Sequence, residues 1–245
     1  MAPLEPSSLE YQIFLILVIL LLVAKLSFSI YLGTKIYKKT KNQGKFTFDF
    51  IFGVFTLMVC LFVSRLLYLF YDFFLTQFNP ANFLNPDALT VWAFASLIST
   101  IGYSAVMFTV DYRVLHFRLK GIFAYIILGV GIFDFIYVMG GFVNTEDAFE
   151  LVNGILIISN VLAIIIPIIF FYIGIKTTGL RKIAFVIAFG VIIFSIGSSL
   201  VLQPIIAPLR DAFGDTVQIP IFLMFFLFKL IGLGMFSYGV TQFSL

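Results

Sequence analysis

Seven apolar segments separated by short polar connections constrain this chain more than any other feature of its sequence. About 20 apolar residues are long enough to cross the hydrocarbon core of a bilayer as an α-helix. The segments lie at about residues 11–34, 48–76, 89–110, 121–142, 151–175, 183–205 and 219–243. Because no connection is long enough to hold a soluble domain, we predict an all-α fold with one seven-helix transmembrane domain over residues 1–245.

Composition agrees with a multi-pass membrane protein. Hydrophobic residues make up 62% of the chain and charged residues only 11%, which is far from the balance of soluble domains. The formal net charge of +3 is small and concentrated in the connections, so no nucleic-acid partner is expected. Cys60 is the single cysteine, and no spacing of ligating residues indicates a metal site. We expect the lipid bilayer of the cell membrane to be its surroundings.

The distribution of basic residues predicts the orientation of the chain. The first, third and fifth connections are basic, whereas the second, fourth and sixth contain only Arg210. Because basic connections stay in the cytoplasm, we predict the N-terminus outside and the C-terminus inside. The basic residues of the inner connections are Lys35, Lys38, Lys39, Lys41, Lys45, Arg113, Arg118, Lys120, Lys176, Arg181 and Lys182.

Short patterns recur between the two halves of the chain. The matching stretches are 31–35 (YLGTK) with 172–176 (YIGIK), 52–54 with 189–191 (both FGV), and 101–102 with 231–232 (both IG). Such self-similarity indicates internal repeats. Segments 1–3 and 5–7 would then be parallel three-helix repeats, and segment 4 would link them. The alternative is seven helices that merely end alike.

This 3+1+3 arrangement resembles that of the sugar-transporting SWEET proteins, and one proposed for microbial opsins. The resemblance implies a transporter built from parallel repeats with its site between them. A lysine in the seventh helix, here Lys229, is also where opsins hold retinal as a Schiff base. However, segment 3 has no acid to act as counterion, and no acid precedes Lys229 by one turn. Segment 6 also lacks the aromatic and proline pattern that encloses retinal, so we expect no cofactor.

Ionisable residues inside the segments predict a ligand-binding site. A charge at the centre of a membrane helix costs at least about 2.5–3.5 kcal/mol, so it usually faces the bundle interior. Arg65, Asp134 and Lys229 would all lie roughly 12–15 Å below the outer surface, from the helical rise per residue. Tyr68 and Asp72 share one helix face with Arg65.

We therefore predict an outward-biased site lined by Arg65, Tyr68, Asp134 and Lys229. Arg65 and Lys229 would hold an anionic group, while Asp134 or Asp72 would balance charge or carry a proton. The alternative to a positively charged site is a neutral lysine, since burial disfavours the charged form. An internal ion pair between Arg65 and either acid is the structural alternative. Lys25, also inside its segment, would either add to the positive charge or extend to the membrane surface.

Neutral polar side chains form stripes on three further segments. They would converge on a wet cavity or, alternatively, serve ordinary helix packing in lipid. The stripes comprise Ser96, Ser99, Thr100 and Tyr103; Asn153 and Asn160, with Pro167; and Ser195, Ser198, Ser199 and Gln203.

A small-molecule carrier or binding protein is the function that these features favour. A receptor or sensor, or an accessory subunit of a membrane complex, is the alternative, and either would act through a partner protein. No hydrolase, metalloprotease or other catalytic motif is present in the sequence, so we expect no enzymatic activity. The expected partners are thus the lipid bilayer, a small anionic molecule and, in the alternative, another membrane protein.

Overall fold

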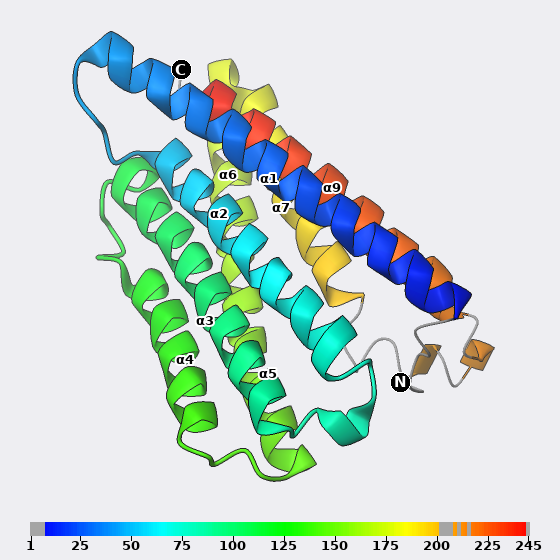
Figure 1. Cartoon of the computed structure of the whole chain (residues 1–245). Helices are drawn as coiled ribbons and strands as arrows, with labels where there is room; N and C mark the ends of the chain where they lie inside the picture. The colour runs from blue at the N-terminus through cyan, green and yellow to red at the C-terminus, as the bar shows by residue number, and fades with distance from the viewer. Residues whose placement is uncertain (1–7, 201–207, 210–211, 215–216, 244–245) are drawn as a thin grey trace.

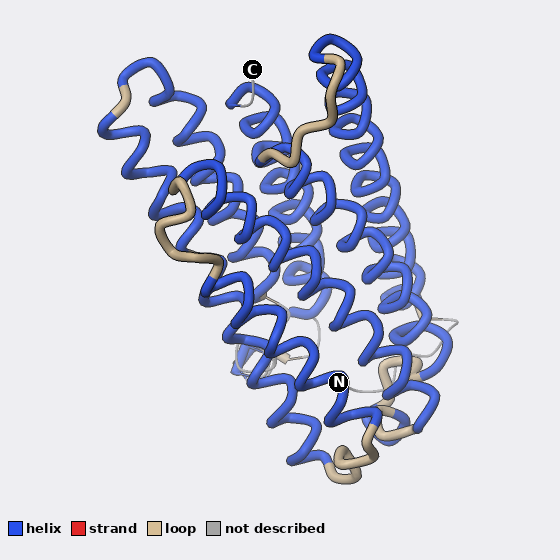
Figure 2. Tube along the Cα trace, turned by 90° about the vertical axis from the view of Figure 1, so that its left-hand side faces the viewer, coloured by secondary structure: helices blue, strands red, loops and turns tan. Residues whose placement is uncertain are grey.

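The computed structural model describes residues 8–200, 208–209, 212–214 and 217–243, without the side chains at 80, 157–161, 163 and 218. These residues form helices and no strands (Figure 2). Six helices are long and apolar enough to cross a membrane, so the protein is a helical membrane protein. The α-helices are α1 (Leu9–Gln43), α2 (Phe50–Leu69), α3 (Pro86–Thr109), α4 (Ile122–Met139), α5 (Glu146–Ala163), α6 (Ile165–Lys176), α7 (Arg181–Ser199) and α9 (Gln218–Phe243).

Helix α1 is longer than its predicted span. Its N-cap is Ser8, whose hydroxyl oxygen accepts a hydrogen bond from the amide of Tyr11, and its C-cap is Gly44 in the left-handed conformation. Its 35 residues would measure about 52 Å at the usual helical rise. A hydrocarbon core is only about 30 Å thick, so the last turns of α1 extend beyond the apolar stretch predicted at 11–34.

Two helices continue into π-helical turns. Helix α2 is followed by η1 (Phe70–Leu75), and α3 is followed by η3 (Val110–Val114). After η3, the carboxylate of Asp111 accepts hydrogen bonds from the amides of Leu119, at 2.9 Å, and Gly121, at 2.6 Å. The connection into α4 is therefore folded tightly around one buried acid.

The fifth predicted span, 151–175, is interrupted. Helix α5 ends at Ala163 and α6 begins at Ile165. Pro167 explains the break, since it has no amide hydrogen to donate to the carbonyl group of Ala163, four residues earlier. The two helices follow one another along the bundle (Figure 1). Helix length alone supports six crossings, and a seventh requires the α5–α6 pair to cross as one unit. The end of the sixth predicted span, 183–205, lies outside the described residues.

The helices pack in chain order around a closed ring. Each of α1, α2, α3 and α4 contacts the next helix, α6 contacts α7, and α7 contacts α9. Helix α9 closes the ring by packing against α1, and both helices run in the same direction (Figure 1). Segments from the two ends of the chain therefore share one interface.

Glycines allow close helix approach in both halves. A Cβ atom on Gly232 of α9 would lie 2.5 Å from the amide nitrogen of Phe194 and 2.7 Å from the carbonyl oxygen of Gly190, both on α7. In the first half, a Cβ atom on Gly102 of α3 would lie 2.7 Å from the Cβ atom of Cys60 and 3.2 Å from the side chain of Leu57, both on α2. Leu57 precedes Phe194 by the same interval that separates 53 from 190 in the predicted repeat.

Candidate functional site

Three basic side chains from α1, α2 and α9 gather inside the bundle. The Nζ atom of Lys229 lies 4.3 Å from the ring centroid of Phe225, and the Cζ atom of Arg65 lies 5.8 Å from the same centroid. Electrostatic interactions link Lys229 with Arg65, and Lys25 with both. We call Lys25, Arg65 and Lys229 the cation cluster. The structure thus brings together two of the predicted ligand residues, Arg65 and Lys229.

Lys25 is a member of this cluster rather than a surface residue. Only 3% of it is exposed, and its ammonium group donates a hydrogen bond to the carbonyl oxygen of Leu61 on α2, at 3.0 Å. The alternative in which Lys25 extends to the membrane surface is therefore wrong. Its position well inside an apolar segment was the available signal for this role.

Asp72 provides the acid that pairs with the cluster. Its carboxylate lies 3.6 Å from Nη1 of Arg65, and the two side chains are 23% and 13% exposed. The Nε atom of Arg65 is buried without a hydrogen-bond partner among the described residues. Within that part of the chain, three cations face one acid in ion-pair contact. When all three basic groups are protonated, this excess produces a positive potential, because charges interact strongly in a low-dielectric interior.

Tyr68 lies beside Arg65 but is directed toward α3. Its hydroxyl group shares a hydrogen bond with the hydroxyl of Ser96, at 2.7 Å, and it interacts electrostatically with Arg65. Tyr68 therefore connects the cation cluster to the polar stripe on α3.

Asp134 occupies a different interface. It lies on the buried face of α4 together with Gly131, where a Cβ atom would clash with Thr100 of α3. Asp134 is 1% exposed, and neither carboxylate oxygen has a hydrogen-bond partner within the described ranges. Among the described residues, no interaction joins Asp134 to Arg65 or Lys229. The structure therefore does not bring Asp134 into the cation cluster.

Most hydroxyl groups of the neutral stripes bond to their own helices. Ser99 and Thr100 donate to carbonyl oxygens on α3, and Ser198 and Ser199 donate to carbonyl oxygens on α7. Asn153 likewise donates to Phe149 on α5. The side chains of Asn160 and Gln203 lie outside the described part of the structure. These bonds are typical of helix packing in lipid.

A small cavity of about 30 Å³ lies between the two halves of the bundle. Its polar lining comes from Tyr103 on α3 and from Ser195 and Ser198 on α7. Phe194 also lines it, and the Nζ atom of Lys229 lies 5.7 Å from the centroid of that ring. Such a cavity has room for about one water molecule. Phe194 thus lines the cavity and also contacts a member of the cation cluster.

Among the described residues, no group of three or more His, Cys, Asp or Glu side chains is arranged to hold a metal ion. Comparison with protein-family models, with curated proteins and with solved structures finds no match to this chain. The function is therefore inferred from the geometry and charge of the site.

Proposed function

We propose that this protein is a small-molecule carrier or binding protein of the cell membrane, and that its cation cluster binds an anionic group. One observation carries this proposal: Arg65 and Lys229 approach the same phenylalanine ring while Lys25 adds a third charge. A membrane protein that places several like charges in its interior needs a compensating anion, since unpaired charges are costly in hydrocarbon.

Lys229 has the fewest polar contacts of the three basic residues in the cation cluster. In the described portion of the chain it has ring contacts with Phe225 and Phe194, but no hydrogen bond or ion pair. A cation–π contact contributes about 0.5–2 kcal/mol, which is less than a charge-assisted hydrogen bond to an anion can add. The expected ligand group is therefore a carboxylate or a phosphate that binds between Lys229 and Arg65.

The other predicted residues have supporting roles in this proposal. Asp72 holds the guanidinium group of Arg65 in the absence of ligand, and Tyr68 borders it. Asp134, at the α3–α4 interface, would balance charge or carry a proton without touching the ligand. The N-terminus would be outside and the C-terminus inside. Seven crossings follow if the α5–α6 pair acts as one, and the close approach of Gly102 to α2 and of Gly232 to α7 supports a parallel 3+1+3 repeat.

Ligand-induced stabilisation of the purified protein tests this proposal. Thermal unfolding in detergent is measured with inorganic phosphate and with a panel of small mono- and dicarboxylates. A ligand at about one hundred times its dissociation constant adds about 2.7 kcal/mol to the stability of the folded state. We expect at least one anion to raise Tm, and Arg65→Gln and Lys229→Gln to weaken its binding about tenfold or more. Lys182→Gln, at an exposed position on α7, is the matched control.

Uptake of the stabilising anion into proteoliposomes then distinguishes carrier from binding protein. If no anion in the panel shifts Tm and a second membrane protein co-purifies in fixed ratio, the cluster serves an accessory subunit and the proposal is wrong.

A further inference from the structure

We propose that the end of the bundle opposite the start of α1 contains a binding site for the phosphate headgroup of an anionic phospholipid. The structure has an open cavity of about 280 Å³ there. Its walls include Lys39, Gln43, Thr47, Asp49, Arg113 and Phe243. We call it the headgroup cavity. It is separate from the cation cluster, so this inference does not depend on the function proposed above.

The headgroup cavity lies where helix ends meet. Lys39 and Gln43 belong to the last turns of α1, Arg113 belongs to η3, and Phe243 ends α9. Because α1 is about 20 Å longer than a hydrocarbon core requires, its last turns reach the level of lipid headgroups. The cavity is therefore placed at the depth where a phosphate group is available.

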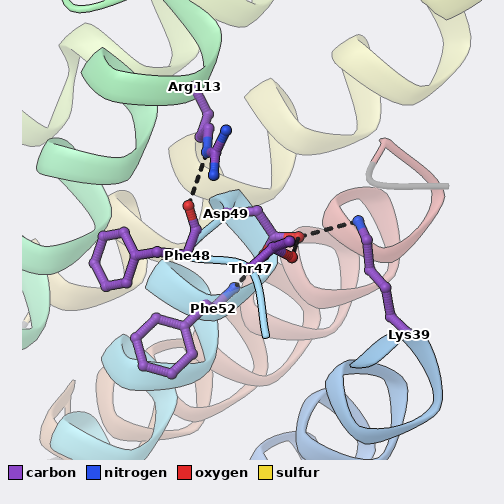
Figure 3. Close-up of polar contacts among 6 residues, drawn as sticks. All are labelled: Lys39, Thr47, Phe48, Asp49, Phe52 and Arg113. Carbon is purple, nitrogen blue, oxygen red and sulfur yellow. Dashed lines mark hydrogen bonds and ion pairs between the residues drawn. The ribbon is translucent and has the colours of Figure 1, made fainter. Parts of the chain in front are cut away.

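Asp49 organises one wall of this cavity (Figure 3). Its carboxylate pairs with the ammonium group of Lys39 at 3.0 Å and accepts hydrogen bonds from the Thr47 hydroxyl at 3.3 Å and the Phe52 amide at 3.2 Å. The last of these bonds caps the N-terminus of α2. With its oxygens engaged in this way, Asp49 fixes Lys39 in place and compensates its charge.

Arg113 approaches the same cavity from η3. Its Nε atom donates a hydrogen bond to the carbonyl oxygen of Phe48 at 2.7 Å, which fixes the plane of the guanidinium group (Figure 3). Its Cζ atom lies 4.9 Å from the ring centroid of Tyr112, and no hydrogen bond of its Nη atoms is found among the residues that the structure describes. A guanidinium group held by Nε still presents donors in the fork geometry that suits phosphate oxygens. Arg113 is thus oriented for an anion that the protein itself does not supply.

The surroundings favour a lipid over a soluble anion. Phe50 and Phe243 give the cavity an apolar side, against which the glycerol and first methylene groups of a lipid can pack. Lys35, Lys38 and Lys41 lie toward the end of α1, and Lys45 follows this helix. Clusters of basic residues next to a membrane helix concentrate anionic lipids, at about 1 kcal/mol for each side chain.

Lipid retention tests this inference on the full-length protein. The protein is reconstituted in nanodiscs of phosphatidylcholine with a one-fifth share of phosphatidylglycerol, extracted gently, and its bound lipids are counted by native mass spectrometry. We expect wild-type protein to retain phosphatidylglycerol over phosphatidylcholine, and Arg113→Gln to reduce this preference about fivefold, the effect of one cation near a lipid surface.

Gln43→Glu and Asn42→Glu form the matched pair. Both positions are exposed at the end of α1 and receive the same charge, but only Gln43 lines the cavity. We expect Gln43→Glu to lower phosphatidylglycerol retention at least threefold more than Asn42→Glu, because its carboxylate faces the phosphate. Equal losses in the two variants would show general electrostatic attraction and overturn the site. A Tm increase with inorganic phosphate, without any phosphatidylglycerol preference, would assign the site to a soluble anion and also overturn the proposal.

Discussion

The ammonium group of Lys25 donates its hydrogen bond to a neutral acceptor, the backbone carbonyl oxygen of Leu61, across 3.0 Å. This contact joins α1 to α2 without an acid. It satisfies one donor but does not compensate the charge. Lys25 also interacts electrostatically with Arg65 and Lys229, so a change at Lys25 affects the whole cation cluster.

Replacing Lys25 by methionine should separate stability from ligand binding. Methionine has a similar length and no charge, and Lys25 has no ion-pair partner among the described residues that its removal would leave unpaired. We expect Lys25→Met to keep or raise Tm without added anion, and to shrink the Tm increase caused by a bound anion. Thermal unfolding with and without anion measures both effects. Lys38→Met, at an exposed position of α1, should change neither, and a large loss of stability in Lys25→Met would mean that the Leu61 contact is needed for folding.

Removing the acid of the cluster should have the opposite effect. Asp72→Asn leaves Arg65 with no ion-pair partner among the described residues. Because both side chains are partly exposed, we expect a loss of about 1–3 kcal/mol, less than the 3–5 kcal/mol typical of a fully buried pair. An added anion should then stabilise the variant more than the wild type. The comparison uses Tm across an anion titration, with Glu150→Gln at an exposed position as control. An unchanged anion response would place the ligand elsewhere.

Close packing of α7 against α9 predicts strong sensitivity at Gly232. Its added Cβ atom would meet backbone atoms of Phe194 and Gly190, which cannot move without separating the helices. We expect Gly232→Ala to destabilise the protein by about 1–3 kcal/mol. Gly129→Ala on α4, where nothing lies within 4 Å of the new atom, should instead stabilise by up to about 1 kcal/mol. Unfolding in mixed micelles compares the pair, and equal effects would contradict the helix contact.

Two buried aspartates should respond differently to the same substitution. Asp111 accepts amide hydrogen bonds from Leu119 and Gly121, whereas Asp134 has no such partner in the described structure. Asp111→Asn should cost about 1.5–3 kcal/mol, the range for hydrogen bonds to charged groups. Asp134→Asn should change stability by less than about 1 kcal/mol, since it removes a carboxyl group without removing a bond. A large loss at Asp134, measured by the same unfolding assay, would reveal a partner there.

The hydropathy of the sequence predicts the positions of the helices more accurately than the positions where they are interrupted. Hydropathy predicts where an apolar helix runs, but the break at Ile164 depends on a single missing amide hydrogen. Pro167 is the residue in the sequence that indicates this break. Likewise, α1 continues past 34 because lysine-rich turns remain helical once they leave the lipid, which an apolar window does not detect.

The structure brings together Arg65 and Lys229 of the predicted site but not Asp134, because depth along a helix does not determine which helices are neighbours. Counting residues along a helix estimates the depth of a side chain, and on that basis Arg65, Lys229 and Asp134 appeared equivalent. Which helices are neighbours depends on packing around the ring. There α9 contacts α1 and α2, while α4 contacts α3 and α5. Because of this order of helices around the ring, Lys25 on α1 lies in the cation cluster and Asp134 on α4 lies outside it.

The interruption between α5 and α6 also has an electrostatic consequence. A continuous helix has its partial charges only at its two ends, in the headgroup regions. A break part-way along adds a second pair, with the negative end of α5 facing the positive end of α6 across Ile164. The second half of the bundle thus contains two helix dipoles aligned head to tail, with opposite poles facing each other at Ile164, whereas no such break interrupts α1, α2 or α3 in the first half.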